Sequence, residues 1–264
     1  MIELGANLAA LVERFEESGT VVTGPALARR AVRLLDLTCL DDSKGEDAIA
    51  DLCRRGQTKL GPVAALCVLP RFVGFTRATL DKAGSSIRVA SVVNFPDGDG
   101  DVAQAGEEAA RAVAEGAEEI DLVFPYRRYQ AGERDEALAM VIGCRAMCGP
   151  DVTLKVILET GSFGAAAQLA AAARDAIAEG ADFLKTSTGR HAKGATLSAA
   201  AVLLGVIHES GGRAGLKVSG GIREAAAVAR YLALADAIMG PDWVSPATFR
   251  VGASGLLDDL LALA

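Results

Sequence analysis

The feature that most constrains the fold is a regular alternation of short apolar runs with helical segments. Eight runs have the length and composition of buried strands, at residues 33–38, 62–69, 87–95, 119–124, 153–159, 182–187, 215–219 and 237–239. Helical periodicity separates them, for example at 46–56, 102–116 and 165–180, and Gly116 and Gly180 stand where two of these helices end. Eight such units of about 29 residues predict an α/β fold, a closed parallel (β/α)8 barrel.

Two segments before the first strand, about 4–18 and 24–31, predict a short N-terminal helical extension. A doubly wound open sheet is the competing architecture, but no Gly-x-Gly-x-x-Gly motif follows the first strand. No linker or shift in composition divides the chain, so we expect one domain over residues 1–264.

An internal repeat supports the barrel. The segments 112–121 and 176–185 share Ala, Glu and Gly positions at a spacing of 64 residues, which is about two strand–helix units. Asp121 and Lys185 fall at equivalent positions of the two segments. We therefore expect their side chains to face the same way.

Charge and composition argue against several classes of protein. The formal net charge of −7 disfavours a nucleic-acid partner or an anionic membrane surface. The N-terminus lacks the basic segment of a secretion signal, and no apolar run is long enough to cross a membrane. Five cysteines without a Cys-x-x-Cys pair indicate free thiols in the cytoplasm. Neither His191 nor His208 has zinc-site spacing, so we expect no metal and no other cofactor.

Four neighbouring strands each carry one charged residue inside an apolar run. They are Asp121 in EIDLVF, Lys155 in TLKVILE, Lys185 in DFLKTS and Lys217 in GLKVS. Each side chain points into the barrel or outward beneath the helices, and both places are dry. One such charge could reach solvent from a strand end, but four on consecutive strands favour a shared buried site.

Three lysines near one aspartate indicate a particular chemistry. Desolvation and neighbouring positive charge both lower the pKa of a lysine, and the neutral amine is a nucleophile. Such an amine attacks a carbonyl carbon to form a Schiff base, whose protonated form accepts electrons from an adjacent carbon–carbon bond. The pattern therefore predicts a metal-free aldolase.

The first two strands carry further candidates. Asp36 stands beside Thr38, where its carboxylate would accept hydrogen bonds from substrate hydroxyls; the alternative is that it caps the following helix. Cys67, late in the second strand, is interpreted as a small core residue.

Three later loops indicate an anion site. SGGIR (219–223) precedes a helix that we expect to begin near Ile222, and VGASG (251–255) opens the last helix in the same way. TSTGR (186–190) adds hydroxyls, a glycine and a guanidinium. Glycines let backbone N–H groups approach an anion closely, and barrel enzymes often bind phosphate after their last two strands. Glycine turns without a ligand are the alternative.

Motifs along nearly the whole chain resemble those of the deoxyribose-phosphate aldolases, which are class I aldolases. The motifs are LCVLPRF (66–72), VVNFPDG (92–98), EIDLVFPY (119–126), LKVILETG (154–161), ADFLKTSTGR (181–190) and LKVSGGIR (216–223). The resemblance implies a barrel that reversibly cleaves 2-deoxy-D-ribose 5-phosphate into acetaldehyde and D-glyceraldehyde 3-phosphate.

The resemblance also implies residue roles. Lys185 would form the Schiff base, Lys217 would lower its pKa, Asp121 would move a proton through a water, and Lys155 would orient Asp121. We expect Asp36, Thr38 and Thr188 to bind substrate. The residues expected around the phosphate are Gly189, Arg190, Gly220, Gly221, Arg223, Gly252 and Ser254.

The chain departs from the family at its C-terminus, and other functions stay open. Some relatives end in a tyrosine that assists proton transfer, whereas this chain ends in LLDDLLALA, so we expect the proton step either to be slower or to use a water and the active-site lysines. The alternatives are another Schiff-base aldolase or transaldolase, a non-catalytic sugar-phosphate-binding barrel, and a phosphosugar isomerase that uses a carboxylate base. Such barrels often pair through surface helices, so we expect a homo-oligomer, either a dimer or a tetramer.

Overall fold

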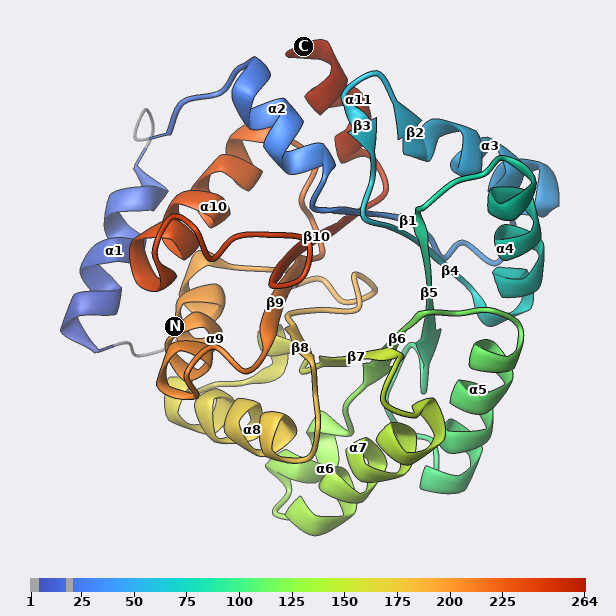
Figure 1. Cartoon of the computed structure of the whole chain (residues 1–264). Coiled ribbons are helices and arrows are strands. Elements are labelled where there is room, and N and C mark those ends of the chain that lie inside the picture. Colours follow the sequence, from blue (N-terminus) through green and yellow to red (C-terminus); the bar gives the residue numbers. More distant parts are fainter. Residues whose placement is uncertain (1–4, 18–20) are drawn as a thin grey trace.

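The computed structural model describes residues 5–17 and 21–264, and these form a closed barrel of parallel strands ringed by helices (Figure 1). The eight barrel strands follow one another in chain order, and the last pairs with the first. They are β1 (Leu35–Cys39), β4 (Ala65–Val68), β5 (Arg88–Val93), β6 (Glu119–Val123), β7 (Thr153–Ile157), β8 (Phe183–Lys185), β9 (Gly215–Ser219) and β10 (Phe249–Ala253). The predicted (β/α)8 barrel is confirmed.

Helices cover the outside of the strands (Figure 1). Two of them, α1 (Ala6–Glu16) and α2 (Pro25–Val32), precede the first strand and form the predicted extension; residues 4 and 18 lie outside the described part of the chain. The others are α3 (Glu46–Gly56), α4 (Val73–Lys82), α5 (Val102–Ala114), α6 (Tyr126–Gln130), α7 (Arg134–Cys148), α8 (Ala166–Ala178), α9 (Leu197–Glu209), α10 (Ala225–Met239) and α11 (Leu256–Ala262).

Local sequence explains where these helices begin and end. In α5, the Asp101 side chain accepts a hydrogen bond from the Gln104 backbone N–H at 2.8 Å, which caps the first turn. Two residues after α5, Gly116 has a φ of 104°, a conformation that favours glycine. The small buried alanines of α5 let the helix pack closely on the sheet.

The eighth strand is the main difference from the sequence prediction. Residues 237–239, predicted as this strand, are the last turn of α10, and the strand is β10. An Ala-Ile-Met run is as compatible with a buried helix as with a short strand. The structure also has a small antiparallel hairpin, β2 (Gln57–Thr58) with β3 (Gly61–Pro62), and two 3-10 turns, η1 (Pro70–Phe72) and η2 (Thr160–Ser162).

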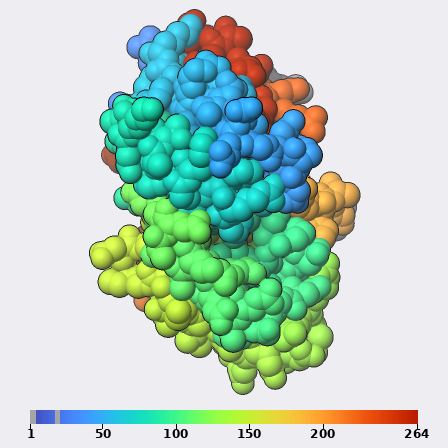
Figure 2. All heavy atoms as spheres, turned by 90° about the vertical axis from the view of Figure 1, so that its right-hand side faces the viewer, coloured from blue at the N-terminus to red at the C-terminus, as the bar shows by residue number. Residues whose placement is uncertain are grey.

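The hydrophobic core lies between the strands and the ring of helices. Every residue of β4, β6, β9 and β10 is buried, because helices cover the outer face of each strand and side chains fill the barrel. Figure 2 shows one side of this shell, where α3, α4 and α5 close over the strands. In the described part of the chain, no helix combines the length and apolar character that crossing a bilayer requires.

Candidate active site

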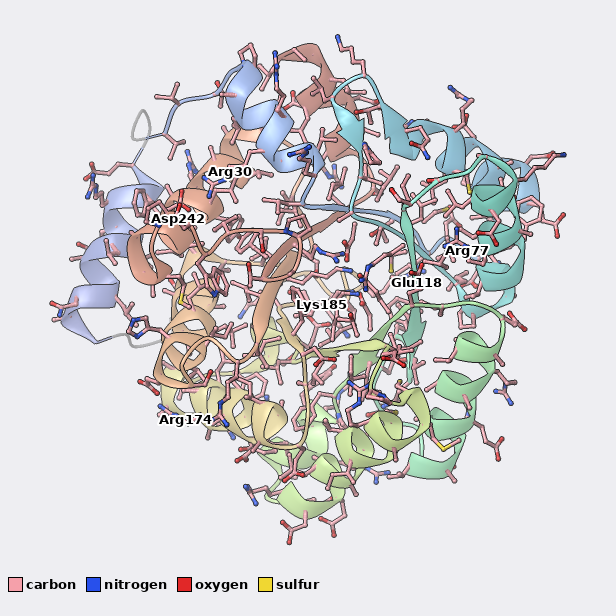
Figure 3. The ribbon with its side chains drawn as sticks, viewed as in Figure 1. Arg30, Arg77, Glu118, Arg174, Lys185 and Asp242 are labelled. Atoms are coloured by element: carbon pink, nitrogen blue, oxygen red, sulfur yellow. The ribbon has the colours of Figure 1, made fainter. Side chains whose placement is uncertain are left out.

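Six adjacent strands direct seven charged side chains into the barrel. All seven are buried, and ion pairs link them across the interior: Asp36, Glu119, Asp121, Lys155, Lys185, Lys217 and Arg250. Figure 3 shows Lys185 near the middle of the ring of strands, whereas Arg30, Arg77 and Arg174 lie among the outer helices. The four charges expected to share a buried site do so, and Asp36 joins them.

Lys185 is the last residue of β8 and contacts the carboxylate of Asp121. Its Nζ lies 2.7 Å from Asp121 Oδ2, so the two side chains face the same way, as the internal repeat predicts. The Lys185 side chain is only 4% exposed, yet it lines a cavity of about 530 Å³ at the carboxyl ends of the strands. None of the other six charged side chains lines this cavity. Lys185 is therefore the one member of the buried charged group that reaches the open cavity.

Lys217 stands beside Lys185 in the neighbouring strand and contacts two carboxylates. The two lysines are directly paired in the register of β8 and β9. Lys217 Nζ lies 2.7 Å from Asp121 Oδ2 and 2.5 Å from Asp36 Oδ2. The ammonium groups of Lys185 and Lys217 therefore lie next to each other and share one carboxylate oxygen, Asp121 Oδ2.

Lys155 holds Asp121 from the opposite side. Its Nζ lies 2.8 Å from Asp121 Oδ1 and 2.6 Å from Glu119 Oε2, and it pairs with Asp121 in the register of β6 and β7. Both oxygens of Asp121 are therefore occupied, and the carboxylate has one fixed orientation. This geometry agrees with the expected orienting role of Lys155.

Sequence reasoning missed two members of the group, Glu119 and Arg250. The Arg250 guanidinium donates to Glu119 Oε1 at 2.8 Å and to Asp36 Oδ1 at 2.7 Å, and so it spans the barrel from β10 to β6. Glu119 lies two residues before Asp121, and strand alternation alone would have placed it on the same face. Arg250 was missed because its strand was not predicted.

The surroundings shift the pKa of Lys185 and of Lys217 in opposite directions. Burial, together with the charge of Lys217, lowers the pKa of Lys185 against the opposing effect of Asp121. Burial also lowers the pKa of Lys217 and of Lys155. Each of these ammonium groups has two carboxylate partners, however, and their negative charges leave its pKa raised. The amine closest to being neutral is therefore the one that reaches the cavity.

Asp121 and Asp36 stay ionised. Burial raises the pKa of Asp121, but Lys155, Lys185 and Lys217 outweigh it and hold that pKa well below its usual range. The pKa of Asp36 is lowered in the same way by Lys217 and Arg250. Asp121 thus presents a fixed negative charge to Lys185, and Asp36 presents one to Lys217.

The residues expected to bind phosphate all line the mouth cavity: Gly189, Arg190, Gly220, Gly221, Arg223, Gly252 and Ser254. Arg190 and Arg223 are exposed there. Arg190 also donates to the backbone carbonyl of Leu40 and lies over the ring of Phe95. Among the hydrogen bonds of the described residues, none uses the N–H groups of Gly189, Gly220 or Gly221 as donors. These N–H groups can therefore serve an anion.

One of the two glycine motifs differs from expectation, whereas VGASG opens α11 at Leu256 as expected. Helix α10 begins at Ala225 rather than near Ile222, and the Ala225 N–H donates to Asp259 at 2.7 Å. Gly252 lies inside β10, not in a loop. A Cβ at Gly252 would lie 3.0 Å from Lys217 Cε, so this glycine makes room for Lys217. Around SGGIR, the cavity is therefore lined by loop backbone and an arginine rather than by a helix N-terminus.

Two of the three expected substrate-binding residues face the cavity. Thr38 and Thr188 line it, whereas Asp36 is fully buried below it, bound to Lys217 and Arg250. Asp36 does not cap a helix either, because α3 begins after Gly45. In the structure its carboxylate supports the lysines, and a direct contact with substrate hydroxyls has no support.

Glu159 is a further buried carboxylate that sequence reasoning passed over. It follows β7 with a left-handed φ of 51°, and its Oε2 accepts hydrogen bonds from the Thr188 hydroxyl at 2.6 Å and the Thr188 N–H at 3.0 Å. Residues other than glycine seldom adopt this backbone conformation. Glu159 thereby fixes the loop that follows Lys185.

Comparisons with known proteins agree on one family. A sequence model described as DeoC/LacD family aldolase matches residues 36–259. A deoxyribose-phosphate aldolase of Agrobacterium fabrum is 48% identical over 234 residues, which is 89% of this chain and 90% of that protein.

Solved structures give the same result. One described as a deoxyribose-phosphate aldolase, from Toxoplasma gondii, superposes with a TM-score of 0.83 at 28% identity, over 90% of this chain and 96% of that one. A second, from Coccidioides immitis, has a TM-score of 0.79 at 25% identity and covers 99% of both chains.

Proposed function

The chain belongs to the DeoC/LacD aldolase family, and from this premise we propose that it reversibly cleaves 2-deoxy-D-ribose 5-phosphate to acetaldehyde and D-glyceraldehyde 3-phosphate. The Agrobacterium fabrum relative carries the name of this activity. The observation that best supports the proposal is Lys185, a buried amine of lowered pKa at the floor of an open cavity. Lys185 is the nucleophile of the proposed reaction.

The first half of the reaction breaks the carbon–carbon bond. The neutral amine of Lys185 adds to the C1 aldehyde carbon of the open-chain sugar, and loss of water gives a protonated imine. The C2–C3 bond then breaks, and its electron pair moves toward the imine nitrogen to leave an enamine. The C3 hydroxyl gives up its proton, which releases D-glyceraldehyde 3-phosphate.

The second half returns the enzyme to its starting state. The enamine takes a proton at C2 and becomes the protonated imine of acetaldehyde. Water adds to this imine, and the adduct collapses to acetaldehyde and the free amine of Lys185. Each proton released is taken up again and no carbon undergoes net oxidation by an external reagent, so the steps balance without an oxidant or reductant.

Asp121 and Lys217 are the proposed proton carriers. Asp121 Oδ2 lies 2.7 Å from the nitrogen of each of the two lysines, so a proton can pass among the three groups. Because Asp121 is fully buried, it would reach the C3 hydroxyl through a water. Lys155 fixes the other oxygen and keeps Asp121 from rotating.

The loops around the cavity are the proposed phosphate site. Arg190 and Arg223 supply positive charge, and the glycine N–H groups supply donors next to it. The formal net charge of −7 makes a local site of this kind necessary for an anionic substrate. The homo-oligomer and the cytoplasmic location expected from the sequence stay predictions.

A cleavage assay tests the proposed function. Acetaldehyde released from 2-deoxy-D-ribose 5-phosphate is measured for the native protein and for Lys185→Leu, with Lys44→Leu as the matched control, since Lys44 lines the same cavity outside the buried group. We expect release by the native protein and the control, and none by Lys185→Leu. No release by the folded native protein, or faster cleavage of another phosphorylated sugar, would contradict the assignment.

A further inference from the structure

The ion-paired group inside the barrel holds unequal numbers of cations and carboxylates; Glu159, the other buried carboxylate, lies outside this group and binds Thr188. Four cations face three carboxylates: Lys155, Lys185, Lys217 and Arg250 against Asp36, Glu119 and Asp121. Fully ionised, the group carries one excess positive charge in a dry interior, where uncompensated charge is costly. Losing one proton from one lysine makes the group neutral.

The contacts determine which lysine loses that proton. Lys155 lies within 3 Å of two carboxylates, Glu119 and Asp121, and Lys217 lies equally close to Asp36 and Asp121. Lys185 contacts Asp121 alone, through an oxygen that Lys217 shares. Among these lysines, Lys185 is the least compensated.

Arg250 and Glu119 are responsible for this distribution. Arg250 cannot release its proton near neutral pH, and it occupies one oxygen of Asp36 and both oxygens of Glu119. Glu119 in turn binds Lys155. Arg250 therefore occupies carboxylate oxygens of Asp36 and Glu119 that would otherwise be free to bind the lysines.

We propose that Arg250 and Glu119 are positioning residues that set how readily Lys185 gives up its proton, an inference that rests on the proposed role of Lys185 as nucleophile. Neither residue lines the mouth cavity, so neither touches the substrate. Both act through the charge that they fix below Lys185.

The other groups in the ion-pair network of Lys185 come from strands around the barrel. Asp121 on β6, Lys155 on β7, Lys217 on β9 and Asp36 on β1 are the charged ones. Cys67 on β4 also faces Lys185, and burial raises the pKa of its thiol, which keeps it neutral. On β5, Arg88 lies 3.8 Å from Glu119 and is half-exposed, so solvent screens it.

The test is the pH dependence of kcat/KM for sugar-phosphate cleavage. Lys185 reacts as the neutral amine, so activity rises as the pH passes the pKa of Lys185 in the free enzyme. Arg250→Gln removes a positive charge, which makes the ammonium form of Lys185 less costly. The rise in activity, which is the acid limb of the pH profile, therefore moves to higher pH. Glu119→Gln removes a negative charge and moves it to lower pH. Each shift is about one pH unit, as expected for a unit charge roughly 10 Å away at an effective dielectric constant of about 20 to 40.

The Arg250→Lys variant distinguishes an effect of the positive charge from an effect of the hydrogen bonds that the guanidinium makes. It loses the paired hydrogen bonds of the guanidinium but keeps the positive charge, so the acid limb stays within a few tenths of a pH unit of the native value. A purely structural role would instead lower activity in all three variants without moving the limb. If Arg250→Gln does not fold, Glu119→Gln and Arg250→Lys carry the test between them.

Two results would overturn the inference. One is an acid limb that stays in place in folded Glu119→Gln; the other is a shift of both Gln variants in the same direction. Opposite shifts with an unmoved limb in Arg250→Lys support it. The native protein is assayed first, because failure to cleave the sugar phosphate would reject the proposed function and not this inference.

Discussion

A single carboxylate contact distinguishes Lys185 from its neighbour Lys217. Both side chains are buried and both bind Asp121, but Lys217 also binds Asp36. With its second carboxylate partner, Lys217 has a raised pKa, whereas the pKa of Lys185 is lowered. Residue type alone does not assign these roles, because the sequence offers three lysines in similar strands.

Replacing Lys217 with leucine tests its role at this scale. The substitution removes the positive charge beside Lys185 and leaves Asp36 and Asp121 with one cation fewer. We expect kcat/KM for cleavage to fall by at least about 100-fold, since proton carriers contribute that much or more. The assay is steady-state acetaldehyde release, with circular dichroism to confirm folding. Activity within about threefold of native would contradict the role.

Glu159 gives a second prediction at the residue scale. Its carboxylate holds Thr188, which faces the cavity. Glu159→Ala removes both hydrogen bonds, so we expect KM to rise about tenfold and stability to fall by about 1–3 kcal/mol. Glu159→Gln keeps an acceptor oxygen and is the matched control, with a smaller loss of both. Equal kinetics in the native and alanine proteins would show that Thr188 does not depend on Glu159.

At the scale of elements, β10 carries more of the site than the sequence indicates. The strand contributes Arg250 to the buried charges and Gly252 to the cavity. These two residues also interrupt the apolar pattern by which strands are recognised, so the functional residues conceal the strand. The 237–239 run resembles a strand because it is continuously apolar, although it closes a 15-residue helix.

Gly252 supplies the prediction for this element. A Cβ there would come within 3.0 Å of both Lys217 Cε and Ser219 Cβ, which is closer than side chains normally pack. We expect Gly252→Ala to displace Lys217 and lower kcat/KM about tenfold or more. Gly255→Ala is the control, because its Cβ would meet no atom within 4 Å and its φ is −111°. Equal activity in the two variants would rule out this close contact as a constraint on Lys217.

At the scale of the whole molecule, the barrel could be predicted because its signal is repeated. Eight units with similar spacing outweigh an error in any one, and the first seven barrel strands, β1 and β4 to β9, lie close to the predicted runs. The centre of the site was also predictable, since Asp121, Lys155, Lys185 and Lys217 each interrupt an apolar strand. The contacts of Arg250 with Asp36 and Glu119 were not, because they join residues more than 130 positions apart. The single domain over 1–264 stays a prediction.

The buried charges also make the stability of the fold depend on pH. The folded-state pKa values of Asp36 and Asp121 lie below the unfolded value of about 4. Their contribution is therefore fully present above that value and is lost as the pH falls below it. We expect the free energy of unfolding to drop by on the order of 2–3 kcal/mol per carboxylate in strong acid. Denaturant titrations from pH 7 to pH 2 measure this, and a constant stability would contradict it.

The most direct measurement traps the covalent intermediate. The native protein is incubated with 2-deoxy-D-ribose 5-phosphate, reduced with borohydride, digested and mapped by mass spectrometry. We predict a stable adduct on Lys185, absent in Lys185→Leu and retained in Lys44→Leu. An adduct on Lys217 would mean that the nucleophile is misassigned, and no adduct in a folded, substrate-binding protein would contradict Schiff-base chemistry.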